Sequence, residues 1–174
     1  MESSIAKITI DHKSRQITSI NHHGGKIRFK CQRCAVFCCK LGSPSLSKTD
    51  VERLRLAVND VERFLDEKHL NLFRRGDGSC IILSFDSQAP LHKCSVYDSR
   101  PALRRLYPFE FQKVTDNSYL LKLITCYNGL NAKGGTVIDT KFVAELVESL
   151  LFELVDSGLV ICPLLGNRNF EMQT

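Results

Sequence analysis

The sequence predicts a small α+β domain with an N-terminal β-hairpin, a cysteine-rich core of irregular segments and a long C-terminal helix. Apolar and polar residues alternate near the N-terminus, four of the eight cysteines fall within residues 31–39, and an apolar stripe of helical period occupies the C-terminal region. A chain of 174 residues can bury one core without covalent cross-links. We therefore expect one domain over residues 1–174, with the hairpin and a following strand in 1–30, the cysteine core in 31–129 and the helix in 136–158.

The N-terminal segment has the pattern of a β-hairpin. Ile8 and Ile10 form one apolar group, Ile17 and Ile20 form a second, and the polar run DHKSRQ separates them. The residues HHGG interrupt this pattern, and KIRFK at 26–30 resumes it as a further strand. The chain is thus expected to enter its cysteine cluster directly from a strand.

Two helical segments are predicted after the cluster. Ser47 has the character of an N-cap with Asp50 three residues later, and apolar residues at helical spacing follow it. The segment DVERFLDEKHL at 60–70 places apolar residues on one helical face. A third, short helix is limited to Ala102–Leu106 by a proline on each side.

Two strands and a long helix complete the expected elements. CIILSF at 80–85 reads as a short strand that begins at Cys80, and NSYLLKLITC at 117–126 as a strand that ends at Cys126, before a glycine-rich loop. The C-terminal helix is closed by Gly158 and carries a stripe formed by Phe142, Val143, Leu146, Val147, Leu150, Leu151, Leu154 and Val155.

Composition narrows the classes of function. The N-terminus lacks the features of a secretory signal and no apolar run is long enough to span a bilayer, so we expect a cytosolic protein that does not enter membranes. Because cytosolic thiols stay reduced, a dense cysteine cluster favours a metal or catalytic site over disulfides. The net charge of +5 comes from basic residues scattered in pairs, which is typical of a solvated surface and disfavours nucleic-acid binding.

The cluster KCQRCAVFCCK at 30–40 has the spacing C-x2-C-x3-C-C. In a helical projection Cys31, Cys34 and Cys38 fall within an arc of roughly 60°, and Cys39 is displaced from Cys38 by about 100°. Neighbouring side chains rarely bind one ion together, so the Cys38–Cys39 pair indicates two metal centres, a multinuclear cluster, or a ligand beside a second thiol. Thiolates favour zinc, iron–sulfur clusters or copper(I). A reactive dithiol is the main alternative, but no thioredoxin-like pattern surrounds the cluster.

Other residues can complete or surround such a site. Cys80, Cys94 and Cys126 each lie next to a turn or strand end, whereas Cys162 has the apolar neighbours of a buried structural thiol. Arg100 and Arg105 lie near Cys94 in the sequence, where a guanidinium can hydrogen-bond a thiolate or form an ordinary salt bridge. We expect Tyr97 and Tyr107 to pack in the core and to take no part in the chemistry of the site. His12, His22 and His23 have the character of turn histidines, although His22 or His23 can serve as a ligand.

These motifs resemble a family of cysteine-cluster proteins described by CxxCxxxCC, a zinc- or iron-chelating domain often called YkgJ-like. The segments that carry the resemblance are FKCQRCAVFCCK, LSKTDVERL, CIIL, KCSVYDSRP, RRLYPFEF and CYNG, spread over residues 29–129. The resemblance implies that the metal-chelating residues are Cys31, Cys34, Cys38, Cys39, Cys80, Cys94 and Cys126. It also implies that a second motif comprises Arg100, Pro101, Arg105, Tyr107 and Pro108.

The chain departs from the family pattern at two positions. Arg104 stands where the family usually has a cysteine, so the expected ligand set is short by one, and an arginine there can pair with excess thiolate charge. Ala35 replaces the more usual glycine. Proteins described as flagellin lysine methylases share the module, but this chain has no G-x-G-x-x-G loop that would mark a Rossmann-type methyl-donor pocket.

The sequence thus supports three readings. The first is a cytosolic protein with a multi-cysteine centre of zinc or iron, alone or in an iron–sulfur cluster, whose role is structural or supports electron transfer. The second is a metal-dependent protein-modifying enzyme with a protein partner. The third and weakest is a zinc-stabilised nucleic-acid-binding module. A structural centre is closed, whereas a catalytic one leaves a coordination position open beside a pocket.

Overall fold

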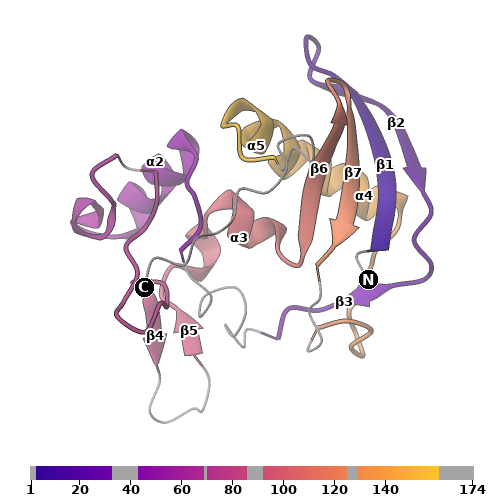
Figure 1. The fold of residues 1–174 in the computed structure, drawn as a ribbon. Helices are drawn as coiled ribbons and strands as arrows, with labels where there is room; N and C mark the ends of the chain where they lie inside the picture. Colours follow the sequence, from indigo (N-terminus) through magenta and orange to yellow (C-terminus); the bar gives the residue numbers. More distant parts are fainter. Residues whose placement is uncertain (1–2, 33–42, 69, 86–91, 125–128, 161–174) are drawn as a thin grey trace.

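A four-stranded antiparallel sheet forms one side of the molecule (Figure 1). The computed structural model describes residues 3–32, 43–68, 70–85, 92–124 and 129–160. The sheet has the order β2-β1-β7-β6 and is built from β1 (Ser3–Asp11), β2 (Gln16–His22), β6 (Phe109–Thr115) and β7 (Ser118–Leu123). The predicted N-terminal hairpin is confirmed as β1 and β2, and the predicted strand before Cys126 as β7. β6, which pairs with β7, was not predicted.

The C-terminal helix packs against this sheet and forms the larger of two hydrophobic cores. It consists of α4 (Thr140–Leu146), the π-helical turn η3 (Val147–Leu151) and α5 (Phe152–Asp156). Gly158 adopts φ +66° directly after it, which confirms the predicted helix end. The helix begins later than predicted because residues 136 and 137 form a strand, β8 (Thr136–Val137). The core includes Ile8, Phe111, Leu121, Val143, Leu151 and Leu154, all at most 2% exposed.

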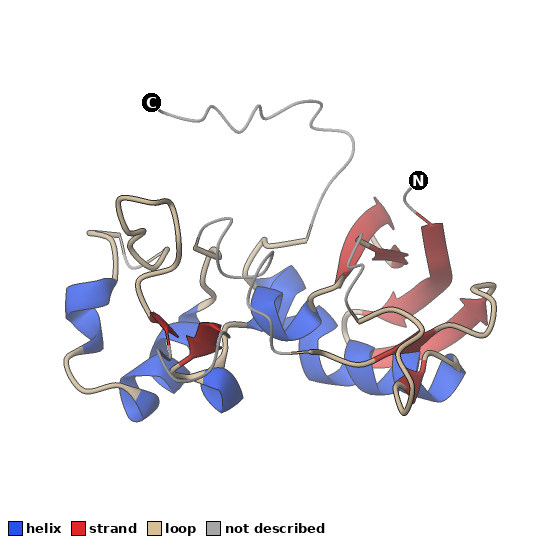
Figure 2. Ribbon diagram, turned by 90° about the horizontal axis from the view of Figure 1, so that it is seen from below, coloured by secondary structure: helices blue, strands red, loops and turns tan. Residues whose placement is uncertain are grey.

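A second hydrophobic core contains Cys80, with Cys94 packed against it. It is formed by helices and short strands at the end of the molecule away from the four-stranded sheet, which we call the cysteine-bearing half (Figure 2). Its elements are α2 (Lys48–Ala57), the 3-10 turns η1 (Val61–Phe64) and η2 (Tyr97–Ser99), β4 (Leu83–Phe85) and β5 (His92–Cys94). The next helix, α3 (Ala102–Leu106), packs in the larger core through Ala102 and Leu106. The helix predicted over 60–70 is confined to η1, because Leu65 forms a bridge with Leu72 instead of continuing the helix. The second core contains Leu46, Leu54, Leu65, Leu72, Cys80, Leu83 and Val96.

A two-stranded sheet connects the strand that precedes the cysteine cluster to the loop before α4. It pairs β3 (Arg28–Phe29), the predicted strand, with β8. The architecture is α+β, as predicted from the sequence. Among the described residues, no helix has both the length and the apolar character needed to cross a membrane.

The carboxylate of Asp50 joins α2 to α3. The predicted capping box is present, since the Ser47 hydroxyl accepts a hydrogen bond from Asp50 N while Asp50 Oδ2 accepts one from Ser47 N. Asp50 Oδ1 also accepts a hydrogen bond from Ala102 N at 2.8 Å, at the start of α3. The side chain is fully buried and burial raises its pKa, so these donors, together with the Arg53 guanidinium at 2.6 Å, offset the cost of desolvation.

Glu153 extends this network to the C-terminal helix. Its carboxylate accepts a hydrogen bond from the Ser47 hydroxyl at 2.8 Å and forms ion pairs with Arg53 at 3.3 Å and Arg105 at 2.9 Å. Ser47 caps α2 and Arg53 lies in α2, which packs in the second core. Arg105 of α3 and Glu153 of α5 lie in helices that pack in the larger core. The network therefore connects the cysteine-bearing half of the molecule to the sheet.

We predict that Asp50→Ala lowers the free energy of unfolding by about 3 kcal/mol. The substitution leaves the N–H groups of Ser47 and Ala102 without an acceptor and Arg53 with one carboxylate fewer. Chemical denaturation measures the change. Glu52→Ala on the same helix is the control, because Glu52 is exposed, and its effect should stay within about 0.5 kcal/mol. Equal losses in the two variants would contradict this account of the network.

Candidate metal centre

Cys80 lies at a tight turn that is held by backbone hydrogen bonds. Arg74 and Cys80 form an isolated bridge, and Leu83 N donates to the Cys80 carbonyl at 3.0 Å. The preceding turn is fixed by Asp77, whose carboxylate accepts hydrogen bonds from the amide and the hydroxyl of Ser79. Cys80 itself is 4% exposed. The turn thus places the Cys80 thiol inside the second core.

Cys94 reaches the same place from the neighbouring strand. It ends β5, where it pairs with Leu83 of β4, and its side chain is half-buried. Cys80 and Cys94 line one small pocket together with Pro44, Leu72, Ile82, Arg100, Pro101 and Arg104. Two of the seven cysteines proposed from the sequence therefore lie at one pocket. Cys80 precedes β4, and Cys94 is the last residue of β5.

The pocket gives Cys80 an environment that opposes ionisation in the absence of metal. Burial raises the pKa of the Cys80 thiol, and the nearby Cys94 raises it further. The backbone of Ile82, the Arg104 guanidinium and the Ser43 hydroxyl act in the opposite direction and lower the same pKa. Arg104 therefore supplies positive charge beside the thiols, as expected for an arginine that compensates thiolate charge.

Ser43 fixes the end of the segment that carries the cysteine cluster. Its hydroxyl donates to the Phe73 carbonyl at 2.9 Å and lies beside the Cys80 thiol, and the adjacent Pro44 lines the thiol pocket. Cys39 is four residues earlier in the sequence. The first described residues after the cluster thus lie at the pocket that contains Cys80 and Cys94.

A second contact brings together the segments that contain Cys31 and Cys126. Lys30, the residue before Cys31, donates its amide to the Gly129 carbonyl at 3.0 Å, and Phe29 forms a bridge with Leu130. A Cβ atom at Gly129 would lie 2.7 Å from the Lys30 carbonyl oxygen, so this close approach requires glycine. Cys31 is exposed, and Cys126 is three residues before Gly129.

The remaining predicted ligands are Cys34, Cys38, Cys39 and Cys126, and they lie outside the described residues, as does Cys162. Cys31, Cys80 and Cys94 are not joined in disulfides within the described part of the chain. Within that part, no three Cys, His, Asp or Glu side chains are arranged to hold a metal ion. The donors at the pocket are sulfur atoms beside an arginine, and this donor set fits zinc or iron.

The two arginines singled out from the sequence have different surroundings. Arg100 stacks on the Tyr97 ring at 3.8 Å, donates to the Tyr97 carbonyl at 2.9 Å and also lines the thiol pocket. Arg105 does not line that pocket and pairs with Glu153. Arg100 thus lies where a hydrogen bond to a thiolate is geometrically accessible, whereas Arg105 belongs to the carboxylate network.

The predicted turn histidines lie on the sheet. His12 Nε2 is 2.6 Å from the Asp116 carbonyl oxygen and 3.1 Å from the Tyr119 hydroxyl, so it joins two hairpin turns. His23 contacts the Ser4 hydroxyl and the Asn21 carbonyl. His22 ends β2, and its Nε2 atom is buried without a hydrogen-bond partner. None of the three lines the pocket that contains Cys80 and Cys94.

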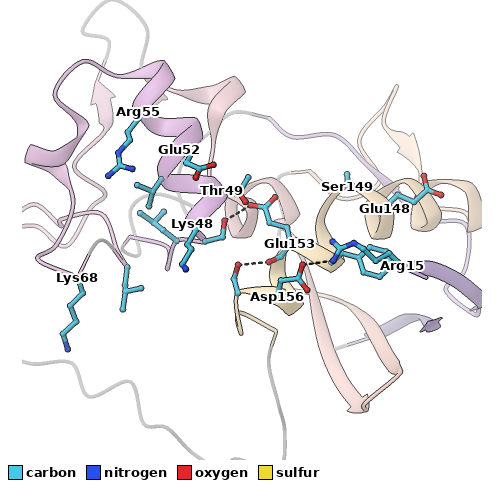
Figure 3. Close-up of a pocket in the computed structure, with 16 residues that line it drawn as sticks. Arg15, Lys48, Thr49, Glu52, Arg55, Lys68, Glu148, Ser149, Glu153 and Asp156 are labelled. Atoms are coloured by element: carbon cyan, nitrogen blue, oxygen red, sulfur yellow. Dashed lines mark hydrogen bonds and ion pairs between the residues drawn. The ribbon is translucent and has the colours of Figure 1, made fainter. Parts of the chain in front are cut away.

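A larger groove lies between α2 and the C-terminal helix, and none of the described cysteines lines it (Figure 3). Its volume is about 850 Å³. Lys48, Glu52 and Arg55 line it on the α2 side, and Glu148 and Glu153 line it on the other side. Arg15 extends into this region, where it pairs with Asp156 at 2.8 Å.

Sequence reasoning missed three features of this region: the contact between Ser43 and Cys80, the carboxylate network and the groove. Each depends on residues that are distant in the chain, such as Ser47 and Glu153. The only local signal was the capping box, which identified Asp50 as a helix cap without indicating its bond to Ala102.

A comparison with known families matches residues 30–126 to the family CxxCxxCC, described as "Putative zinc- or iron-chelating domain". The matched region contains all seven proposed ligands, and this chain has three residues between its second and third cysteines. Comparisons with curated proteins and with solved structures gave no significant match. Because the family match covers more than half of the chain, the protein belongs to this family of zinc- or iron-chelating domains.

Proposed function

We propose that the protein is a cytosolic metal-chelating protein whose thiolate centre has mainly a structural role. The observation that supports this most directly is the shared pocket of Cys80 and Cys94, which are soft donors placed side by side on a rigid turn and strand. The proposed ligands are completed by Cys31, Cys34, Cys38, Cys39 and Cys126. Bound zinc or iron would join four segments of the chain.

Two anchors support the assembly of these segments. Ser43, four residues after Cys39, lies beside the Cys80 thiol, and Lys30, directly before Cys31, donates a hydrogen bond to Gly129, three residues after Cys126. Described residues on both sides of the cluster thus have contacts with segments that lie next to other proposed ligands. A metal bound by these cysteines would close the chain between the two anchors.

Burial at the thiol pocket supports a closed centre over a catalytic one. Cys80 is 4% exposed and the pocket that it shares with Cys94 is small. The larger groove contains no cysteine among its lining residues. A protein-modifying enzyme with the metal at its active site would need an open coordination position beside such a groove. The described residues thus favour the structural role.

We predict that Cys80→Ser and Cys94→Ser each remove most of the bound metal, because each variant deletes a thiolate from the centre. Elemental mass spectrometry on protein purified without air measures iron and zinc per chain. Loss of metal should also lower the free energy of unfolding by several kcal/mol, since metal binding is coupled to folding. Cys162→Ser is the matched control and should retain its metal. Full metal content in both Cys80→Ser and Cys94→Ser would contradict the proposal.

We predict that Arg104→Ala weakens metal binding by about tenfold at neutral pH. Arg104 lowers the pKa of Cys80, so its removal raises that pKa and protons compete better with metal for the thiolate. The midpoint of metal binding should therefore move to higher pH, which a titration of metal occupancy against pH measures. Arg104→Lys retains the charge and serves as the control.

Arg104→Cys tests the same position from the opposite direction. The variant adds a thiol to the pocket and removes the positive charge, so metal bound per chain should rise. Unchanged stoichiometry, together with an unshifted pH midpoint in Arg104→Ala, would contradict the role that we assign to Arg104.

A further inference from the structure

The outer edge of β2 has no strand beside it. β2 stands at the end of the sheet order and pairs only with β1 within the described residues. In an antiparallel sheet, alternate residues of an edge strand direct their N–H and C=O groups away from the paired neighbour. Such a row of backbone groups is a template for another strand. The edge of β2 is thus a surface that can accept one.

The side chains of β2 lack the features that usually prevent such pairing. Its sequence, QITSINH, contains no charged residue and no proline. The opposite edge strand, β6, differs because it contains Glu110 and Lys113, and Lys113 pairs with Asp116 at 2.8 Å. Charged side chains on an edge strand discourage edge-to-edge association. Only one of the two edges of this sheet is therefore open to a further strand.

Apolar side chains beside this edge are incompletely covered. Ile17 and Ile20 of β2 pack against the larger core but are only partly buried. Their neighbours on β1, Ile8 and Ile10, are 0% and 1% exposed because strands flank β1 on both sides. A strand added beside Ile20 would cover that side chain as β2 covers Ile8 of β1, which adds apolar burial to the backbone hydrogen bonds.

We propose that this edge binds a second copy of the chain, by antiparallel pairing of β2 with β2 along residues 20–22, with Asn21 at the twofold axis. In this stretch the register against β1 is regular, since the irregularity lies at Thr9 and Ile10. Antiparallel pairing of two identical strands satisfies both edges under one twofold axis, which is the symmetry of most protein dimers. The two sheets become one continuous sheet. A short strand-to-strand interface is well below the area of a permanent dimer, so the association is weak and depends on concentration.

Sedimentation velocity of the metal-loaded protein under reducing conditions tests this proposal, from low micromolar to several hundred micromolar. The wild-type protein should pass from monomer to dimer, and hydrogen exchange at the amides of 20–22 should slow as the dimer forms. Asn21→Lys should move the midpoint to a concentration at least about tenfold higher, because it places like charges near the twofold axis. Asn21 is exposed, so the variant is expected to fold, which circular dichroism checks.

Two controls make the test specific to β2. Asn21→Thr keeps the edge uncharged and should dimerise as the wild type does. Val114→Lys places a charge on β6, where Val114 is 42% exposed, and should also dimerise normally. A wild-type protein that stays monomeric throughout would overturn the proposal. A dimer that survives Asn21→Lys unchanged, or is lost in Val114→Lys, would also overturn it.

Discussion

The buried carboxylate of Asp50 is the interaction on which the arrangement of the cysteine-bearing half depends. One of its oxygens accepts from Ser47 at the start of α2, and the other accepts from Ala102 at the start of α3. α2 follows the cysteine cluster in the chain, and α3 carries Arg104 into the thiol pocket. One carboxylate thus accepts hydrogen bonds at the first turns of both helices. It joins α3, which lines the thiol pocket through Arg104, to α2, which packs in the same hydrophobic core as Cys80. Through Arg53 and Glu153 the same network reaches the C-terminal helix and the sheet.

In our proposal, a metal ion replaces the proton of the Cys80 thiol. Burial raises the pKa of Cys80, which keeps the thiol protonated when no metal is bound. A thiolate formed there without compensation would be costly, and Arg104 reduces that cost. A metal ion supplies far more positive charge at the same place, so binding and deprotonation are coupled. This coupling explains why cysteines in a buried turn can belong to a binding site and not only to a core.

Local patterns predicted much of the fold, and long-range contacts account for the rest. The hairpin of β1 and β2, the capping box at Ser47 and the end of the C-terminal helix depend on neighbouring residues, and all three are confirmed. The helix predicted at 60–70 fails because Asp66 instead accepts hydrogen bonds from Leu70 and Asn71 and closes a turn. β6 was missed because its assignment depends on pairing with β7. The cysteine spacing pointed to a metal site, but the contact of Ser43 with Cys80 requires the folded chain.

X-ray absorption spectroscopy at the edge of the bound metal tests the central claim most directly, because it reports the atoms that surround the metal. The account predicts a first shell made of sulfur at about 2.3 Å, for either zinc or iron, that is depleted when Cys80 or Cys94 is replaced by serine. A first shell dominated by nitrogen or oxygen near about 2.0 Å, or one that is unchanged in both variants, would contradict it.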